Sequence, residues 1–233
     1  FFFTGPQIIA QTANNYFQID TLSSTPNVTQ STMSMAINST TAVIVAGRYP
    51  SALGRTLLDG GVWDFTVSAN VDSTGGTSQI SCGITVVTTP AGVTYTTTGT
   101  GTSRTVTSSN DSPFTGVTAS ADMRLSSWFR SPQGLYQVTG YTSASVITIA
   151  TPSTYVNETS VSGAVSFPYV LTDWQQITST TINQFDFTVL AADRAVNTTD
   201  TIGFILFGKT TTNRTIYTTL GGTTNATHIT TPF

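Results

Sequence analysis

Apolar and polar residues alternate along much of this 233-residue chain, and this period of two is the feature that most limits its fold. The clearest case is "VWDFTVSANV" at 62–71, where Trp63, Phe65 and Val67 fall on one side. Asp64 and Thr66 fall on the other. Successive side chains of a strand point to opposite faces, so this segment is predicted to be a strand with one buried face. No segment keeps the i, i+3, i+4 apolar spacing of an amphipathic helix. The sequence therefore predicts an all-β chain.

Further segments have the same strand character, and Gly, Pro, Asn and Asp separate them at hairpin-like distances. They lie at 16–20, 31–37, 41–49, 78–87, 135–141, 145–150, 185–192, 201–208, 214–220 and 226–231. The stretch "IGFILFG" at 202–208 is almost continuously apolar, which predicts burial on both of its faces. We expect an antiparallel jelly roll or β-sandwich of about ten short strands.

The length fits one all-β domain, so we expect a single jelly-roll domain over residues 1–233. Within it, a longer irregular or inserted region is expected around residues 90–180. The Thr/Ser/Gly-rich part of that region, at 88–116, fits either a hairpin with a ladder of threonines or a long surface loop. A chain of two lobes is also compatible with the pattern.

Charged residues make up only 8% of the chain, against about a quarter in an average protein, whereas threonine occurs fifty times. Such a surface must be hydrated by hydroxyl and amide groups. A phosphate-binding surface needs clustered basic side chains, but the net charge is −3 and the only lysine is Lys209. No nucleic-acid partner is therefore expected. No apolar run reaches the roughly 18 residues of a membrane-spanning helix.

The inventory of chemically reactive side chains is small. His228 is the only histidine and Cys82 the only cysteine, so one subunit cannot supply the three or four ligands of a zinc site. A serine hydrolase triad also has no G-x-S-x-G motif to support it. Paired carboxylates could serve a glycosidase, but Glu158, Asp64 and Asp186 share no compact motif. We expect no catalytic site, no metal site and no cofactor. Cys82 is expected to be a buried core thiol.

Two kinds of surface site remain as hypotheses. Trp128, Phe129 and Tyr136 are candidates for stacking on a sugar ring, with core aromatic residues as the alternative. Seven N-x-S/T sequons are candidates for N-glycosylation, at Asn27, Asn38, Asn110, Asn157, Asn197, Asn213 and Asn225.

Three segments together resemble a known family. They are "FFFTGP" with "NNYFQID" near the start, "GRTLLDGGVWDFTVSANVDSTGGTSQISCGITVV" at 54–87, and the end from "AADRAVNTTD" to "TTNATHITTPF". This pattern resembles the C1q/tumour-necrosis-factor-like jelly-roll domain of minor capsid and fibre-head proteins of large double-stranded DNA viruses and tailed phages. The resemblance covers roughly residues 1–90 and 183–233. It implies a trimeric jelly roll without enzymatic activity, in which His228 matches a residue that recurs on the last strand.

The resemblance leads us to expect a non-enzymatic structural protein on the virion surface, of the minor capsid, penton or fibre-head type. Its expected partners are further copies of itself, as a homotrimer, then neighbouring capsid proteins and host surface glycans. The residues expected to take part in assembly are Phe1, Phe2, Phe3, Ile8, Ile9 and His228. The alternative is an extracellular, N-glycosylated filament subunit, such as an archaeal thread or pilus. Its apolar N-terminal segment would pair with a neighbouring subunit by donor-strand exchange.

Overall fold

A computed structural model describes residues 2–3, 8–11, 16–19, 22–23, 31–110, 112–221 and 227–232, with side chains from residue 32 onward. The protein is all-β, as the alternation predicted, and its strands pair mainly antiparallel, whereas the strands Tyr16–Ile19 and Thr41–Arg48 pair in parallel. The one helical element in these ranges is the short 3₁₀ helix Met123–Leu125. None of the described helical residues forms a span long and apolar enough to cross a membrane.

The chain divides into two compact units, where the sequence predicted one domain with an inserted region. Unit 1 comprises residues 1–10, 15–84 and 169–233, and unit 2 comprises residues 11–14 and 85–168. The expected irregular region around 90–180 thus corresponds for the most part to a unit with regular strands of its own. Two of these strands lie at the predicted segments 135–141 and 145–150, whereas others were obscured because threonine takes both buried and exposed strand positions.

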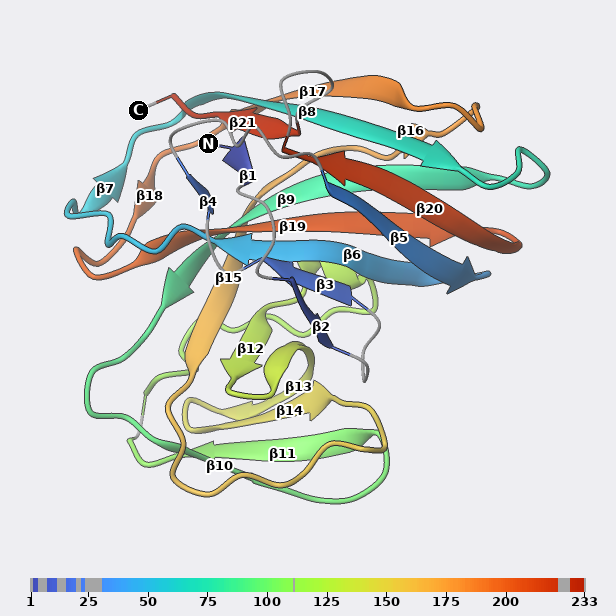
Figure 1. Ribbon diagram of the computed structural model, residues 1–233. Helices are drawn as coiled ribbons and strands as arrows, with labels where there is room; N and C mark the ends of the chain where they lie inside the picture. Colours follow the sequence, from blue (N-terminus) through green and yellow to red (C-terminus); the bar gives the residue numbers. More distant parts are fainter. Residues whose placement is uncertain are drawn as a thin grey trace. The chain divides into compact units, whose positions relative to one another are not determined.

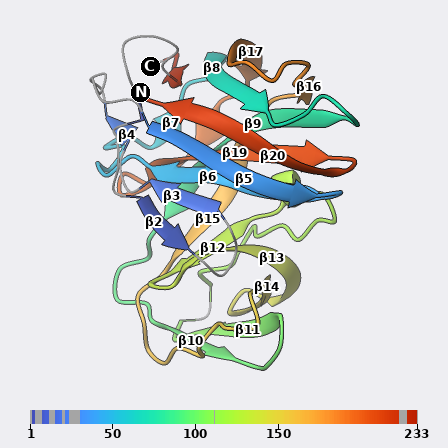
Figure 2. The ribbon, with the colours of Figure 1, turned by 45° about the vertical axis from the view of Figure 1, so that its right-hand side comes forward.

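Unit 1 is built from two sheets, drawn in Figures 1 and 2. The strands of the first sheet are β1 (Phe2–Phe3), β4 (Leu22–Ser23), β5 (Ser31–Asn38), β8 (Gly61–Val71), β17 (Asn183–Ala191), β20 (Asn213–Leu220) and β21 (His228–Thr230). Those of the second are β2 (Ile8–Gln11), β3 (Tyr16–Ile19), β6 (Thr41–Arg48), β9 (Ser78–Thr88), β16 (Gln175–Gln176) and β19 (Thr201–Thr210). A further small sheet pairs β7 (Leu57–Leu58) with β18 (Arg194–Ala195).

The strand order of unit 1 is that of a jelly roll. The first sheet runs β4-β1-β21-β8-β20-β5, with β17 on the other edge of β8. The second runs β9-β19-β6-β3-β2, with β16 paired to β9. From β6 onward the chain passes back and forth between the sheets, through β8, β9, β17, β19 and β20 in turn. This interleaving of the two sheets is how a jelly roll forms a sandwich.

Strands β20 and β21 occupy successive lengths of the same edge of β8. Thr219 of β20 lies opposite Ser68, and His228 of β21 lies opposite Thr66. The buried hydroxyl of Thr227 connects the two stretches, because its Oγ1 accepts from the Ser68 N–H at 3.3 Å and donates to the Thr219 carbonyl at 2.6 Å. These bonds satisfy backbone groups at the point where the ladder passes from one strand to the next.

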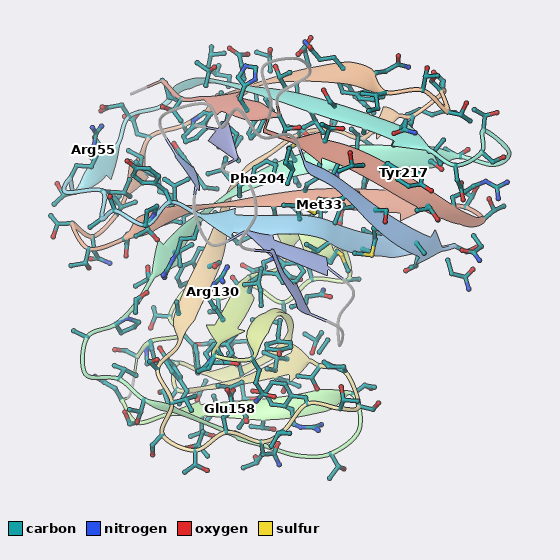
Figure 3. The ribbon with its side chains drawn as sticks, viewed as in Figure 1. Met33, Arg55, Arg130, Glu158, Phe204 and Tyr217 are labelled. Carbon is teal, nitrogen blue, oxygen red and sulfur yellow. The ribbon has the colours of Figure 1, made fainter. Side chains whose placement is uncertain are left out.

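The interior of unit 1 is lined by the inward positions of β5, β6, β8, β19 and β20, and Figure 3 labels two of its buried residues, Met33 and Phe204. Gly208 of β19 is required by this packing. A Cβ atom there would lie 2.7 Å from the Cδ1 methyl groups of Ile37 and Ile44, and 3.0 Å from that of Ile216. Residues 202–208 of β19 are all buried, which confirms the predicted burial of "IGFILFG".

Unit 2 contains a sheet of order β10-β11-β14-β13-β12-β15. The strands are β10 (Tyr95–Thr98), β11 (Ser103–Ser108), β12 (Trp128–Ser131), β13 (Gly134–Ser143), β14 (Val146–Ala150) and β15 (Ala164–Leu171), of which β15 continues into unit 1. The Thr-rich stretch that fitted either a hairpin or a loop is a hairpin, because β10 pairs with β11 over four residue pairs. Tyr95, Phe114 and Phe129 form the centre of the core, with ring centroids 5.1–6.3 Å apart.

Two charged side chains are buried in unit 2. Arg104 is 4% exposed, and its guanidinium donates to the carbonyl groups of Gly101, Ser103 and Tyr155. Glu158, labelled in Figure 3, accepts a short hydrogen bond from the Tyr155 hydroxyl. The Glu158 N–H donates to Thr97 Oγ1, and the Thr97 N–H donates to the Glu158 carbonyl. These contacts hold the segment 155–161 against β10, so the only glutamate of the chain has a structural role here.

Candidate assembly surface

The outward sides of β8, β17 and β21 together form an exposed surface of unit 1. Inward residues of β8 from Trp63 to Val71 are at most 1% exposed, as the alternation predicted. The intervening side chains point out of the sandwich and meet the outward residues of β17 and β21. We call this surface the β8 outer face, and its members are Val62, Asp64, Thr66, Gln184, Asp186, Thr188, Leu190, His228 and Thr230.

Hydroxyl groups hold both carboxylates of this face. Thr66 Oγ1 donates to Asp186 Oδ1 at 2.9 Å, and Thr188 Oγ1 donates to Asp64 Oδ1 at 2.7 Å. Each pair is directly opposite in the β8–β17 register. Gln184 Nε2 adds bonds of 3.0 and 3.2 Å to the two oxygens of Asp186. Because these bonds are made within the chain, covering the face would leave fewer unpaired polar groups than covering bare carboxylates.

An exposed apolar pair lies at the end of the same ladder. Leu190 is 80% exposed, Val62 is 47% exposed, and they are opposite each other in the β8–β17 register. Two large aliphatic side chains directly opposite on an open sheet face present continuous apolar surface to water. This pair is small, but adjacent apolar side chains bordered by polar groups can form the centre of a protein contact.

His228 lies on the opposite border of this face. It pairs with Thr66 on one side and with Phe2 of β1 on the other. Its neighbour Ile229 is 1% exposed and points inward, so the imidazole belongs to the outward side. Among the residues with described side chains, no three His, Cys, Asp or Glu side chains lie close enough together to hold a metal ion. His228 is thus placed next to hydroxyls and the Thr66–Asp186 pair.

The remaining residues predicted to take part in assembly lie at the N-terminus. Phe2 and Phe3 form β1, which pairs with β21 and with β4 of the same chain. Ile8 and Ile9 belong to β2 in the second sheet. Phe1 lies outside the described residues. Among these described residues, Phe2 is the one whose backbone pairs with a strand of the β8 outer face, at His228.

The proposed sugar-stacking residues need correction. Trp128 is 4% exposed, Phe129 is fully buried and Tyr136 is 1% exposed. Phe129 and Tyr136 belong to the core of unit 2, where Tyr136 packs edge-on against Tyr155. A ring with no accessible face cannot stack on a sugar from solvent. The alternative interpretation, core aromatic residues, describes these three side chains.

The sequon asparagines within the described ranges are all exposed: Asn38, Asn110, Asn157, Asn197 and Asn213. Asn27 and Asn225 lie outside the described residues. Asn38 and Asn213 are directly opposite each other in the β5–β20 register. Asn157 donates from Nδ2 to the Gly99 carbonyl, and the amide of Asn197 is bonded to Asp200.

Sequence reasoning missed Gln184, Thr188 and Leu190 as surface residues of interest. The alternation of "NQFDFTVLA" at 183–191 does place them on one side of a strand. It cannot place that strand beside β8, which is more than a hundred residues away. Their joint role is therefore visible only in the folded chain.

The sequence matches no protein-family model, and no curated protein matches it at a significant level.

Proposed function

We propose that this protein is a non-enzymatic structural subunit that assembles with copies of itself, as a homotrimer, on the exterior of a large DNA virus or phage virion. The observation that carries the proposal is the β8 outer face, where the exposed pair Leu190 and Val62 adjoins carboxylates already bonded by threonines. Neighbouring capsid proteins would contact the assembled subunits.

The apolar pair supplies the driving force for such a contact. Burial of a large aliphatic side chain contributes about 1.5–3 kcal/mol. Leu190 is exposed enough to realise most of that gain when a partner covers it. The polar part of the face supplies orientation, because hydroxyls and amides can pair with a partner without stripping water from unpaired ions.

The charge on this face favours one kind of contact. The strands β8, β17 and β21 carry the carboxylates of Asp64 and Asp186 but no lysine or arginine. Two identical copies packed face to face would bring four carboxylates together. We therefore infer a head-to-tail contact with a different part of the next subunit, which closes into a ring when the rotation is right. A trimer is such a ring.

The virion location follows from the family resemblance, and the jelly-roll strand order of unit 1 is compatible with it. Host glycan contact through Trp128, Phe129 and Tyr136 forms no part of the proposal, since these rings are buried.

A filament subunit is the second candidate, because β1 contributes only the two residues Phe2 and Phe3 to its sheet. A strand this short could be supplied by a neighbouring copy with little change to the sheet. Deletion of residues 1–10 separates the two models. A closed trimer is expected to survive the deletion, whereas a donor-strand filament would fall apart.

The proposal is tested by sedimentation velocity of the wild type and two leucine variants. Leu190→Asp places a charge on the apolar pair and is expected to convert the oligomer to a monomer. Leu125→Asp is the matched control, since Leu125 is also an exposed leucine, at 49%, but lies in the 3₁₀ helix of unit 2. A wild-type oligomer that persists unchanged in Leu190→Asp would refute the role of the β8 outer face.

A further inference from the structure

The strands β10, β11 and β14 of unit 2 present a face made mostly of threonines, which we call the threonine face; Ser103, Val146 and Ala150 lie on the same side. Its members are Thr96, Thr98, Thr105, Thr107 and Thr148. The alternate residues Val106, Ile147 and Ile149 are fully buried in the core of unit 2, so the threonines point the opposite way. All five are at least partly exposed. The assembly proposed above makes no use of them.

The threonines form rows across the sheet. Thr98 lies opposite Thr105, and Thr105 lies opposite Thr148, which gives a row of three hydroxyls over three strands. In the next row Thr96 lies opposite Thr107, and Thr107 lies opposite the partly exposed Val146. Thr96 Oγ1 also accepts a bond of 3.4 Å from the Ser160 N–H. Beyond Thr148 the row continues to Gly140 of β13, where an added Cβ would come within 3.2 Å of the Thr148 side chain. The strands are about 4.8 Å apart and like-facing residues about 7 Å apart along each strand, so the hydroxyls are regularly spaced.

No charged side chain interrupts these rows. Arg104 is the only charged residue of the three strands, and its buried guanidinium is held by backbone carbonyls within unit 2. A threonine hydroxyl both donates and accepts hydrogen bonds, so two threonines that meet across a two-fold axis can always pair. The face is thus complementary to itself, and packing two copies together would desolvate no ion and oppose no like charges.

We propose that the threonine face is a two-fold contact between unit 2 of one copy and unit 2 of a second copy. This inference rests on the proposed self-assembly, in which the β8 outer face makes the head-to-tail contact and the threonine face joins one oligomer to the next. An isologous contact joins the same surface of two copies. The carboxylates of the β8 outer face disfavour such a contact, whereas the uncharged threonine face favours it. The two faces therefore serve two different kinds of interface.

The size of the face fits a secondary contact. Three strands about 4.8 Å apart and roughly five residues long cover roughly 240 Å². A stable, specific interface buries roughly 800 Å² on each partner. A single pair of threonine faces is consequently expected to associate weakly. Several pairs acting between two oligomers raise the effective affinity, as in other multivalent contacts.

The experiment compares sedimentation velocity at increasing concentrations for the wild type, Thr105→Arg and Thr115→Arg. Thr105 lies in the middle of the row of three threonines. Thr115 is an exposed threonine in the turn that carries Phe114 into the core, away from the threonine face. The wild type and Thr115→Arg are expected to form species larger than the basic oligomer as concentration rises. In Thr105→Arg the two copies would bring arginines of like charge together at the contact. This variant is therefore expected to need at least about tenfold higher concentration to form the same fraction of larger species.

Two further measurements make the result decisive. Unchanged thermal unfolding of Thr105→Arg verifies that the fold is intact. Leu190→Asp separates this inference from the proposed function, because it removes the basic oligomer and leaves the threonine face available for a weak dimer. Wild-type oligomers that never associate further, or that associate equally well in Thr105→Arg, would overturn the inference. A loss of binding to neutral glycans in Thr105→Arg without any change in sedimentation would also overturn it, and would assign the face to a sugar.

Discussion

Replacement of Gly208 by alanine tests the packing of the jelly roll most sharply. The new Cβ would lie 2.7 Å from two isoleucine Cδ1 methyl groups and 3.0 Å from a third. All three isoleucines are at most 1% exposed, so their methyl groups can shift only within the packed interior. Overpacking of this kind costs about 1–3 kcal/mol. Alanine recovers about 0.5–1 kcal/mol relative to glycine within a strand. Taking the middle of each range, we therefore expect a net loss of about 1.2 kcal/mol in the free energy of unfolding.

The assay is urea unfolding followed by tryptophan fluorescence, to which the buried Trp63 of unit 1 contributes. With a slope of about 2 kcal/mol per molar urea, the midpoint of Gly208→Ala should fall by roughly 0.5–1 M. Gly83→Ala is the control, because the nearest atom to its Cβ is a ring carbon of Phe207 at 3.3 Å and the others lie beyond 3.5 Å. It should cost less than Gly208→Ala, because its closest contact, at 3.3 Å, is longer than the 2.7 Å at Gly208.

A double-mutant cycle identifies the cause. Ile44→Val removes one of the clashing methyl groups and should cost about 0.5–1.5 kcal/mol alone. In the Gly208→Ala background it should cost less, because the removed methyl group relieves the clash. A Gly208→Ala protein as stable as the wild type, or costs that simply add, would refute the packing described for the interior of unit 1.

Three other predictions concern single groups. Thr227→Val should lower the free energy of unfolding by about 1–3 kcal/mol, because it removes the hydroxyl that bonds the Ser68 N–H and the Thr219 carbonyl. The control Thr230→Val, at an exposed position, should change it by less than about 0.5 kcal/mol. Equal effects of the two substitutions would contradict the role of Thr227 in connecting β8 with β20. Phe129→Ala should cost about 3–5 kcal/mol in the same assay, since a core ring is removed; a stable variant would mean that the ring is accessible after all. Burial raises the pKa of Tyr95 to about 12. Because the phenol of the unfolded chain ionises at a lower pH, the free energy of unfolding should fall as pH rises above about 10. Thermal unfolding at a series of pH values measures this, and a stability that stays constant from about pH 9 to 12 would contradict the burial of Tyr95.

Local pattern was enough to predict most strands of unit 1. The alternation from Val62 to Val71 describes β8, and the apolar run from Ile202 to Gly208 describes β19, because each depends only on which side of its own strand is buried. Alternation gives faces but not neighbours. The bond from Thr188 to Asp64 joins residues 124 positions apart, and nothing in either segment indicates the other.

Unit 2 was harder to predict for a different reason. Threonine occupies both sides of its strands, as in β10, where Thr97 is buried and Thr96 is not, so hydrophobicity does not alternate clearly. The adjacent aromatic residues Trp128 and Phe129 resembled an exposed binding platform. They are instead neighbours in β12, a strand that is buried on both faces, and a single strand sequence does not distinguish these cases.

The claim that matters most is that the chain assembles with itself. It is tested most directly by the absolute mass of the full-length protein in solution, measured by light scattering during size exclusion at several loading concentrations. The account predicts a discrete species of three times 24.6 kDa that persists on dilution to the low micromolar range. A protein that elutes with a mass of 24.6 kDa at every concentration would contradict it.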